Sequence, residues 1–212
     1  MASYSFFMRA KVKQGRSLDG GAEESPLPRK TRVDAERNRE SLVDAGKEVF
    51  ANSGASASLE EIARRAGVGI GTLYRHFPTR DALIEGVYRR ELEYLADSAR
   101  QLDGVLAPGE ALDKWMRLFV DYIATKKVLA SALSSTIGVA SDLAASSRVQ
   151  ILDAITFLIH RAAAAGDIRS DIEPLDLLRA LAGFTYGAIG PEWEPSANRM
   201  IDLLMDGLRS RS

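Results

Sequence analysis

The sequence has no cysteine and only two histidines in 212 residues. Without cysteine, disulfides, zinc fingers and thiol nucleophiles are excluded, and His76 and His160 are too few for a histidine-rich metal site. No stretch approaches the roughly 20 consecutive apolar residues that a membrane helix needs. We therefore expect no membrane segment, no metal and no cofactor. The lack of cysteine also fits a reducing cytoplasm, which is the location we expect.

Signals for an enzyme are equally scarce. The glycines of residues 67–71 superficially suggest a phosphate loop, but the charged segment 60–65 precedes them instead of a buried strand. Asp and Glu fall mainly on the exposed faces of expected helices, and no pair stands out as a catalytic couple. We predict that the protein is not an enzyme.

Helical spacing of apolar residues recurs from Asp34 to Arg209, whereas the alternation typical of strands is absent. The sequence predicts an all-α protein of about nine helices. Residues 1–32 are rich in Gly, Ser, Pro and charge, which indicates a disordered basic tail and not a secretory signal. The expected helices are 34–52, 59–66, 70–76, 79–102, 108–126, 128–137, 142–165, 174–189 and 196–209.

The net charge is −1, but the charges are distributed unevenly along the sequence. Through Arg90, 16 Lys and Arg stand against 12 Asp and Glu, a net charge of +4; from Glu91 onward 12 stand against 17, a net charge of −5. A basic N-terminal part on an acidic remainder favours approach to a polyanion through the basic part alone.

Residues 59–83 are the most informative segment, because they have the spacing of two short helices joined by a glycine turn and followed by a longer helix. Ser58 can cap the first short helix, with the Glu61 side chain returning a hydrogen bond to the cap. Gly67 can adopt the positive φ that ends this helix. The layout predicts a helix-turn-helix that binds DNA.

The second short helix divides by face. Leu73 and Phe77 can point inward, while small or polar residues on the other side can approach a duplex. Arg75 can form a forked contact to guanine or phosphate, and Thr72 can touch a thymine methyl group. The predicted DNA-binding residues are Ser58, Gly69, Ile70, Gly71, Thr72, Tyr74, Arg75, His76, Thr79 and Arg80.

From about Asn38 to Val87 the sequence resembles the DNA-binding domain of the TetR family of bacterial transcriptional regulators, the family of the tetracycline repressor. Arg80 stands where the family more often has Lys, and Gly46 replaces a usual Ala in the first helix. The matching pieces are 45–50, Gly54, Leu59-Glu60-Glu61-Ile62-Ala63, Ala66-Gly67-Val68, Gly71-Thr72-Leu73-Tyr74-Arg75-His76-Phe77 and Asp81-Ala82-Leu83.

This resemblance implies a DNA-binding head at 33–80 and an effector-binding and dimerisation body at 81–212. It also implies a repressor that a small molecule releases from its operator, which twofold symmetry would make palindromic. Aromatic side chains of the middle helices suit an apolar or planar ligand, although such a stripe is often plain core. The candidate ligand residues are Trp115, Met116, Phe119, Tyr122, Phe157, His160, Phe184 and Tyr186.

The last two expected helices are more apolar than a surface pair requires, and their small residues permit close helix approach. We interpret them as a homodimer interface, as the resemblance implies, with an intramolecular core as the alternative. A regulator or architectural DNA-binding protein without an effector is the alternative function. The candidate interface residues are Leu178, Leu181, Ala182, Thr185, Ile189, Met200, Ile201, Leu204 and Leu208.

Overall fold

The computed structural model describes residues 28–132, 137–187 and 192–209. These residues form eight α-helices and one 3-10 turn, so the predicted all-α fold is confirmed. Their only β-type pairing is an isolated bridge between Ile168 and Arg209. No helix in the described ranges combines the length and the apolar character that a bilayer span requires. The chain divides into residues 1–35 and 36–212, and the contacts given below lie within the second part.

Most helix bounds agree with the sequence prediction, with three exceptions. The first helix begins before residue 34, and the helix expected to end near 126 continues to Ala132, which removes the separate helix expected from 128. The helix expected from 142 begins at Ile137. Leu129 is buried, so the apolar stripe continues past the two lysines that suggested a break. The elements are α2 (Pro28–Ser53), η1 (Gly54–Ser56), α3 (Leu59–Arg65), α4 (Ile70–His76), α5 (Arg80–Asp103), α6 (Pro108–Ala132), α7 (Ile137–Ala164), α8 (Pro174–Gly187) and α9 (Trp193–Leu208).

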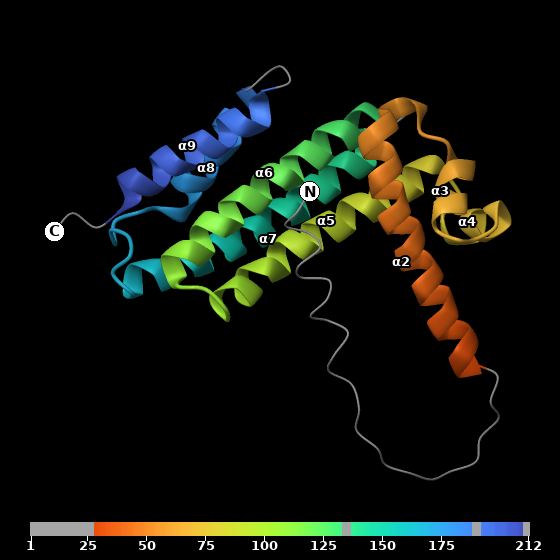
Figure 1. The fold of residues 1–212 in the computed structure, drawn as a ribbon, viewed down its shortest axis with the longest axis horizontal. Coiled ribbons are helices and arrows are strands. Elements are labelled where there is room, and N and C mark those ends of the chain that lie inside the picture. The colour runs from red at the N-terminus through yellow and green to blue at the C-terminus, as the bar shows by residue number, and fades with distance from the viewer. Residues whose placement is uncertain (1–27, 133–136, 188–191, 210–212) are drawn as a thin grey trace, which may run out of the picture. The chain divides into compact units, whose positions relative to one another are not determined.

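The head consists of α2, α3, α4 and the first turns of α5, and α3 and α4 lie side by side (Figure 1). Its core is one cluster of buried side chains from these helices, joined by Leu129 from the end of α6. Burial of such side chains contributes about 1.5–3 kcal/mol each. The largest fully buried members are Leu42, Phe50, Ile62, Leu73, Phe77, Leu83 and Ile84.

Two glycines allow close packing around α5. A Cβ atom at Gly86 would lie 2.8 Å from the Phe77 ring, and one at Gly46 would lie 3.2 Å from Val87. The structure thus explains the departure at residue 46 noted in the sequence, since a glycine there lets α2 approach α5 closely. Phe77, which ends α4, is likewise fixed against α5.

In the body, α5, α6 and α7 run alongside one another (Figure 1). The indole Nε1 of Trp115 donates a 2.9 Å hydrogen bond to the carbonyl oxygen of Leu95, which ties α6 to α5 in the interior. The body residues of α5 that are buried include Leu92, Leu95, Ala99 and Leu102. At 1.5 Å per residue, α5 spans about 35 Å and thereby enters both cores.

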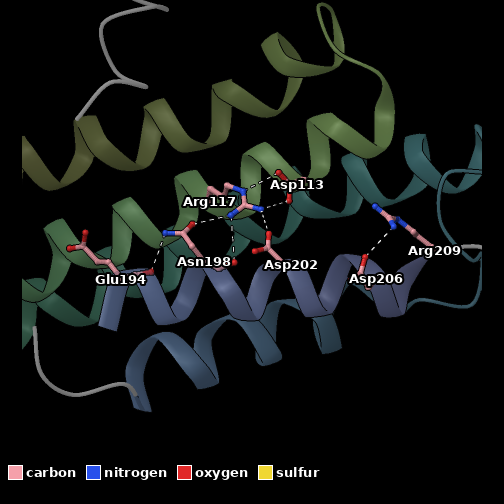
Figure 2. Close-up of polar contacts among 7 residues, drawn as sticks. All are labelled: Asp113, Arg117, Glu194, Asn198, Asp202, Asp206 and Arg209. Atoms are coloured by element: carbon pink, nitrogen blue, oxygen red, sulfur yellow. Dashed lines mark hydrogen bonds and ion pairs between the residues drawn. The ribbon is translucent and has the colours of Figure 1, made fainter. Parts of the chain in front are cut away.

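Helix α9 is held on α6 by a polar cluster centred on Arg117, as Figure 2 shows. The guanidinium pairs with Asp113 of the same helix at 2.9 Å and with Asp202 of α9 at 2.5 Å. The hydrogen bonds that Arg117 donates, first to Asp113 and then to Asp202, raise the pKa of Arg117 above its ordinary value. Because Arg117 also contacts Asn198, the pairing fixes which face of α9 turns toward α6.

Candidate nucleic-acid interface and ligand cavity

The start of α3 is capped as predicted in one respect and differs in another. The Ser58 side chain accepts a hydrogen bond from the backbone N–H of Glu61. The Glu61 side chain does not complete the predicted reciprocal cap, because its carboxylate instead accepts hydrogen bonds from Arg64 and Arg65. Gly67 has φ of 71° and ends α3 as expected.

Helix α4 has an inward and an outward face, which confirms that prediction. Leu73 is fully buried, and Phe77 is 2% exposed. On the other face, Ile70 is 37% exposed and Tyr74 is 47% exposed. Helix α4 therefore presents an accessible surface although its opposite side is firmly packed.

The ten predicted DNA-binding residues lie at the start of α3, along α4 and at the start of α5. The β-carbon positions of Gly69 and Gly71 meet no atom within 4 Å, so the backbone of α4 is open to close approach there. Thr79 uses its hydroxyl to cap α5, by accepting from the N–H of Ala82 at 3.0 Å. Exposed members are Ser58, Gly69, Ile70, Gly71, Tyr74, Arg75 and Thr79; half-buried members are Thr72, His76 and Arg80.

Arg80 has a different environment from the one predicted. Its guanidinium donates hydrogen bonds to the carbonyl oxygens of Ala57 and Gly54, and it stacks over the Phe50 ring at 5.1 Å. These contacts tie the start of α5 to the loop that follows α2. The side chain predicted to hold a phosphate is thus engaged within the head.

The cations on α3 are also paired within the protein. Glu61 is bound by Arg65 and Arg64, and these hydrogen bonds, that from Arg65 first, hold the pKa of the Glu61 carboxyl below its usual range. Arg75 on α4 makes no comparable ion pair among the described residues. The positive charge best placed to meet an external anion is therefore on α4.

A cavity of about 520 Å³ lies among α6, α7 and α8. Its walls are mainly apolar, and its volume falls within the range of about 300–1,000 Å³ typical of small-molecule sites. The lining residues are Phe119, Tyr122, Ile123, Lys126, Ser147, Arg148, Ile151, Leu152, Leu175, Leu178, Arg179 and Ala182.

A chain of hydroxyl groups connects this cavity to α5. Tyr122 of α6 donates a 2.8 Å hydrogen bond to the Tyr88 hydroxyl, and the Tyr88 hydroxyl lies 2.9 Å from Oγ of Ser147 on α7. Tyr122 and Ser147 line the cavity. Tyr88 follows Val87 of the head core directly, so the wall of the cavity is bonded to the helix that carries the head.

Only part of the predicted ligand set lies at this cavity. Phe119 and Tyr122 line it, whereas Trp115 and Met116 are fully buried in the core beside it. Phe157 lies in a separate depression under Arg100, and His160 is exposed. Phe184 is half-buried and is not among the lining residues, and the side chain of Tyr186 lies outside the described residues.

Several residues predicted to form the dimer interface lie instead in the interior of the single chain. Leu181, Thr185, Ile201 and Leu208 are buried within the single chain, where they pack α8 and α9 onto the body. These side chains correspond to the intramolecular alternative, because each helix turns its most apolar face inward. Leu178 and Ala182 line the cavity, Ile189 lies outside the described residues, and Leu204 is half-buried.

The outer face of α8 and α9 retains the features expected of an interface. Met200 is 39% exposed and Leu203 is 65% exposed. Gly183 and Gly207 open onto free space, since added β-carbons would meet no atom within 4 Å. The exposed small or apolar positions on these helices are Ala180 and Gly183 of α8 and Met200, Leu203 and Gly207 of α9, and together they are called the outer face of α8 and α9 below.

Two sequence models of known families match the chain. The model of bacterial regulatory proteins of the tetR family matches residues 42–87, and that of the SbtR-like transcriptional regulator C-terminal domain matches residues 107–210. The crystal structure of the TetR transcriptional regulator SCO0520 from Streptomyces coelicolor is 46% identical with a TM-score of 0.75, and the match covers 82% of this chain and 99% of that one. The chain belongs to the TetR family of transcriptional regulators.

Other TetR-family relatives agree. The structure of a TetR transcription regulatory protein from Mycobacterium vanbaalenii is 33% identical with a TM-score of 0.70, over 85% of this chain and 99% of that one. The HTH-type transcriptional regulator SrpR from Pseudomonas putida is 42% identical over 62 residues, which are 29% of each chain. The match with SrpR thus spans less than a third of its length. Both family models describe regulators, in agreement with the prediction that this TetR-family chain is not an enzyme.

Sequence reasoning missed the cavity residues that lie outside the aromatic stripe. For Tyr88, which lies beside the cavity wall, nothing in its spacing along α5 indicates that its hydroxyl meets Tyr122 and Ser147. Lys126 and Arg148 were not singled out, because isolated cations on amphipathic helices usually mark a solvated face. Their convergence depends on how three helices pack, which helical periodicity does not specify.

We predict that Arg80→Ala destabilises the head, whereas Arg75→Ala does not. Removal of the Arg80 guanidinium takes a donor from the part-buried carbonyl oxygen of Ala57, whereas the Gly54 oxygen keeps the N–H of Ala57 as a donor. The free energy of unfolding should therefore fall by about 1–3 kcal/mol. Arg75 is exposed, and its removal should change that free energy by less than about 0.5 kcal/mol. Urea unfolding followed by circular dichroism, without DNA, measures both. Equal stability of the two variants would contradict the structural role of Arg80.

Proposed function

We propose that this protein is a sequence-specific, ligand-responsive repressor that inserts α4 into the major groove of operator DNA. The observation that carries the proposal is the division of α4 into a buried face at Leu73 and an accessible face at Gly71, Tyr74 and Arg75. A recognition helix needs both: one face fixes its position in the head, and the other meets the duplex. We also propose a cytoplasmic location, because operator binding requires access to the DNA.

The accessible face of α4 contains complementary chemistry for DNA. The open backbone at Gly69 and Gly71 permits close approach to the groove, and Arg75 can donate a forked pair of hydrogen bonds to guanine. Tyr74 and His76 flank this residue and can reach the phosphates. With Arg80 engaged inside the head, its contribution to DNA binding is to hold the start of α5 in place.

We further propose that the protein acts as a homodimer through the outer face of α8 and α9. Twofold symmetry would place two copies of α4 in successive major grooves, roughly 34 Å apart, and would make the operator palindromic. Support comes from Met200 and Leu203, which remain exposed although both belong to packed helices, and from the open glycines beside them.

Release from DNA would follow ligand entry into the cavity. A molecule lodged against Tyr122 and Ser147 competes for hydroxyl groups that bond to Tyr88 of α5. A ligand that binds more tightly to a conformation with a displaced α5 lowers the affinity of the head for the operator. By thermodynamic linkage, operator DNA lowers the affinity for the ligand by the same factor. The cavity favours this proposal over an architectural protein without an effector, because such a protein has no use for a preformed apolar site.

The first test measures the affinity of the Arg75→Ala variant for operator DNA. The operator is identified beforehand by footprinting the DNA that flanks the gene of this protein. Loss of a base contact should weaken specific binding by about 1–3 kcal/mol and relax the preference at one position. Arg169→Ala, at an exposed arginine of the body, is the control and should bind normally. If Arg75→Ala binds the operator and random duplex like the parent, α4 does not read the operator through this residue.

The second test concerns the dimer. We expect Leu203→Glu to convert the dimer to monomer at micromolar concentration, because a charge would be buried at the interface. Val105→Glu is the matched control, since Val105 is 67% exposed and lies on the loop before α6. Sedimentation equilibrium measures both variants. A parent chain that is monomeric without DNA would refute the interface.

The third test addresses release. In a small-molecule screen for loss of operator binding, active compounds should lower the operator affinity of the parent protein about 5- to 150-fold. Ala182→Trp fills the cavity and should keep operator binding while losing this response. Ala164→Trp adds the same volume at an exposed position of α7, outside the cavity, and should respond normally. Compounds that act equally on the parent and Ala182→Trp would show that the cavity is not the effector site.

A further inference from the structure

Helix α4 has exposed apolar side chains as well as polar ones. Among the side chains that the structure describes between residues 36 and 103, the large apolar ones left exposed are Ile70 and Tyr74, and both lie on α4. They are four residues apart, as are Gly71 and Arg75, so the two pairs form neighbouring rows along the helix. Ile70 therefore belongs to the face that the proposed function places in the major groove.

The chemistry of Ile70 limits what it can contact in that groove. Its neighbours Thr72 and Arg75 have polar groups that can bond to phosphates or base edges, whereas Ile70 has none. The base edges present hydrogen-bond donors and acceptors, and the one apolar group among them is the C5-methyl group of thymine. An isoleucine against any other base edge would take water from polar atoms without replacing their hydrogen bonds. Thymine is thus the base that complements Ile70.

Two glycines allow this side chain to come close to a base. Gly69 and Gly71 flank Ile70, and β-carbons added to them would meet no atom within 4 Å. Because neither neighbour has a side chain, nothing next to residue 70 holds the backbone away from the base edges. An isoleucine extends less far than an arginine, so a contact through Ile70 needs this close approach.

The position of the Ile70 side chain is also well defined. Ile70 is the first residue of α4, and a β-branched side chain in a helix has one strongly preferred χ1 rotamer. Leu73, which is fully buried, fixes the same helix in the head. Little side-chain entropy is therefore lost when Ile70 meets a methyl group, and a base that lacks this group cannot be accommodated by a change of rotamer.

We propose that Ile70 recognises a thymine in each half-site of the operator, through van der Waals contact with the C5-methyl group of the base. This inference rests on the proposed function, because it concerns the same face of α4. It goes further by naming the base pair that is preferred at one position, A·T over G·C, and the chemical group that determines the preference.

The test removes the methyl group from the DNA but keeps the hydrogen-bonding edge of the base. The full-length protein is footprinted on the DNA that flanks its gene, and each thymine of the protected segment is replaced in turn by deoxyuridine. Fluorescence anisotropy measures the affinity for each duplex. At one position in a half-site the replacement should lower the affinity of the parent protein about three- to fivefold, as expected for one buried methyl group. If no replacement lowers it by more than about twofold, the inference is overturned.

Two variants assign the contact to Ile70. The ratio of affinities for the thymine and deoxyuridine duplexes should fall below about twofold in Ile70→Ala, because the partner of the methyl group is absent. Ile70→Val keeps the branched β-carbon and is shorter by one methylene, so its ratio should lie between those of the parent and Ile70→Ala. Neither change touches the buried cluster of the head, so circular dichroism should show both variants folded.

Thr72→Ser is the matched control within α4. It removes a methyl group from the other residue that can touch thymine and keeps the hydroxyl, and the ratio of affinities for the two duplexes should equal that of the parent. The inference is overturned if Thr72→Ser loses the dependence on the methyl group, or if Ile70→Ala keeps it in full.

The same measurements separate this inference from the proposed function. A parent protein that binds a defined operator through Arg75, but accepts deoxyuridine at every position, supports recognition by α4 and overturns the role of Ile70. The absence of any protected segment overturns the proposed function and this inference with it.

Discussion

Helix α5 buries its first turns in the head core through Leu83, Ile84 and Val87, and its remaining turns in the body through Leu92 and Leu95. Because one rigid helix belongs to both cores, neither can repack along it without moving the other. Densely packed interiors transmit such displacement instead of absorbing it. The position of α4 depends on this helix as well, since Phe77 packs against Gly86 with no room for an added methyl group.

Polar contacts determine where α5 can lie between its neighbours. Lys47 of α2 forms a 2.6 Å ion pair with Glu91, which is almost fully buried. A buried pair of this kind adds little net stability, but loss of its geometry leaves an uncompensated charge. On another side, the hydroxyl of Tyr88 joins α5 to α6 and α7. The head is therefore held at a defined position by bonds with strict distance requirements, and one set of them borders the cavity.

The head was predictable because its signals are local. Ser58, Gly67 and Leu73 act within one or two helical turns, and each has the predicted role. The failures involve competition between partners: Glu61 meets two arginines one turn ahead instead of its own cap, and Arg80 finds carbonyl oxygens more than 20 residues away. In the body, helical periodicity identified the apolar faces but not whether a helix of the same chain or a partner chain packs on each of them. Leu181 and Ile201 were therefore assigned to a partner chain although they pack inside this one.

Helix α8 connects ligand and dimer in the proposed mechanism. Leu178 and Ala182 line the cavity on one side, while Ala180 and Gly183 open outward on the other. Its C-terminal half is tied to α6 and α9 by Lys127, which donates to the Thr185 carbonyl at 2.6 Å and lies over the Trp193 ring. A ligand that shifts α8 would therefore move the proposed contact surface together with the cavity wall. The spacing of the two heads would then respond to the ligand by two routes, through α5 within each subunit and through α8 between subunits.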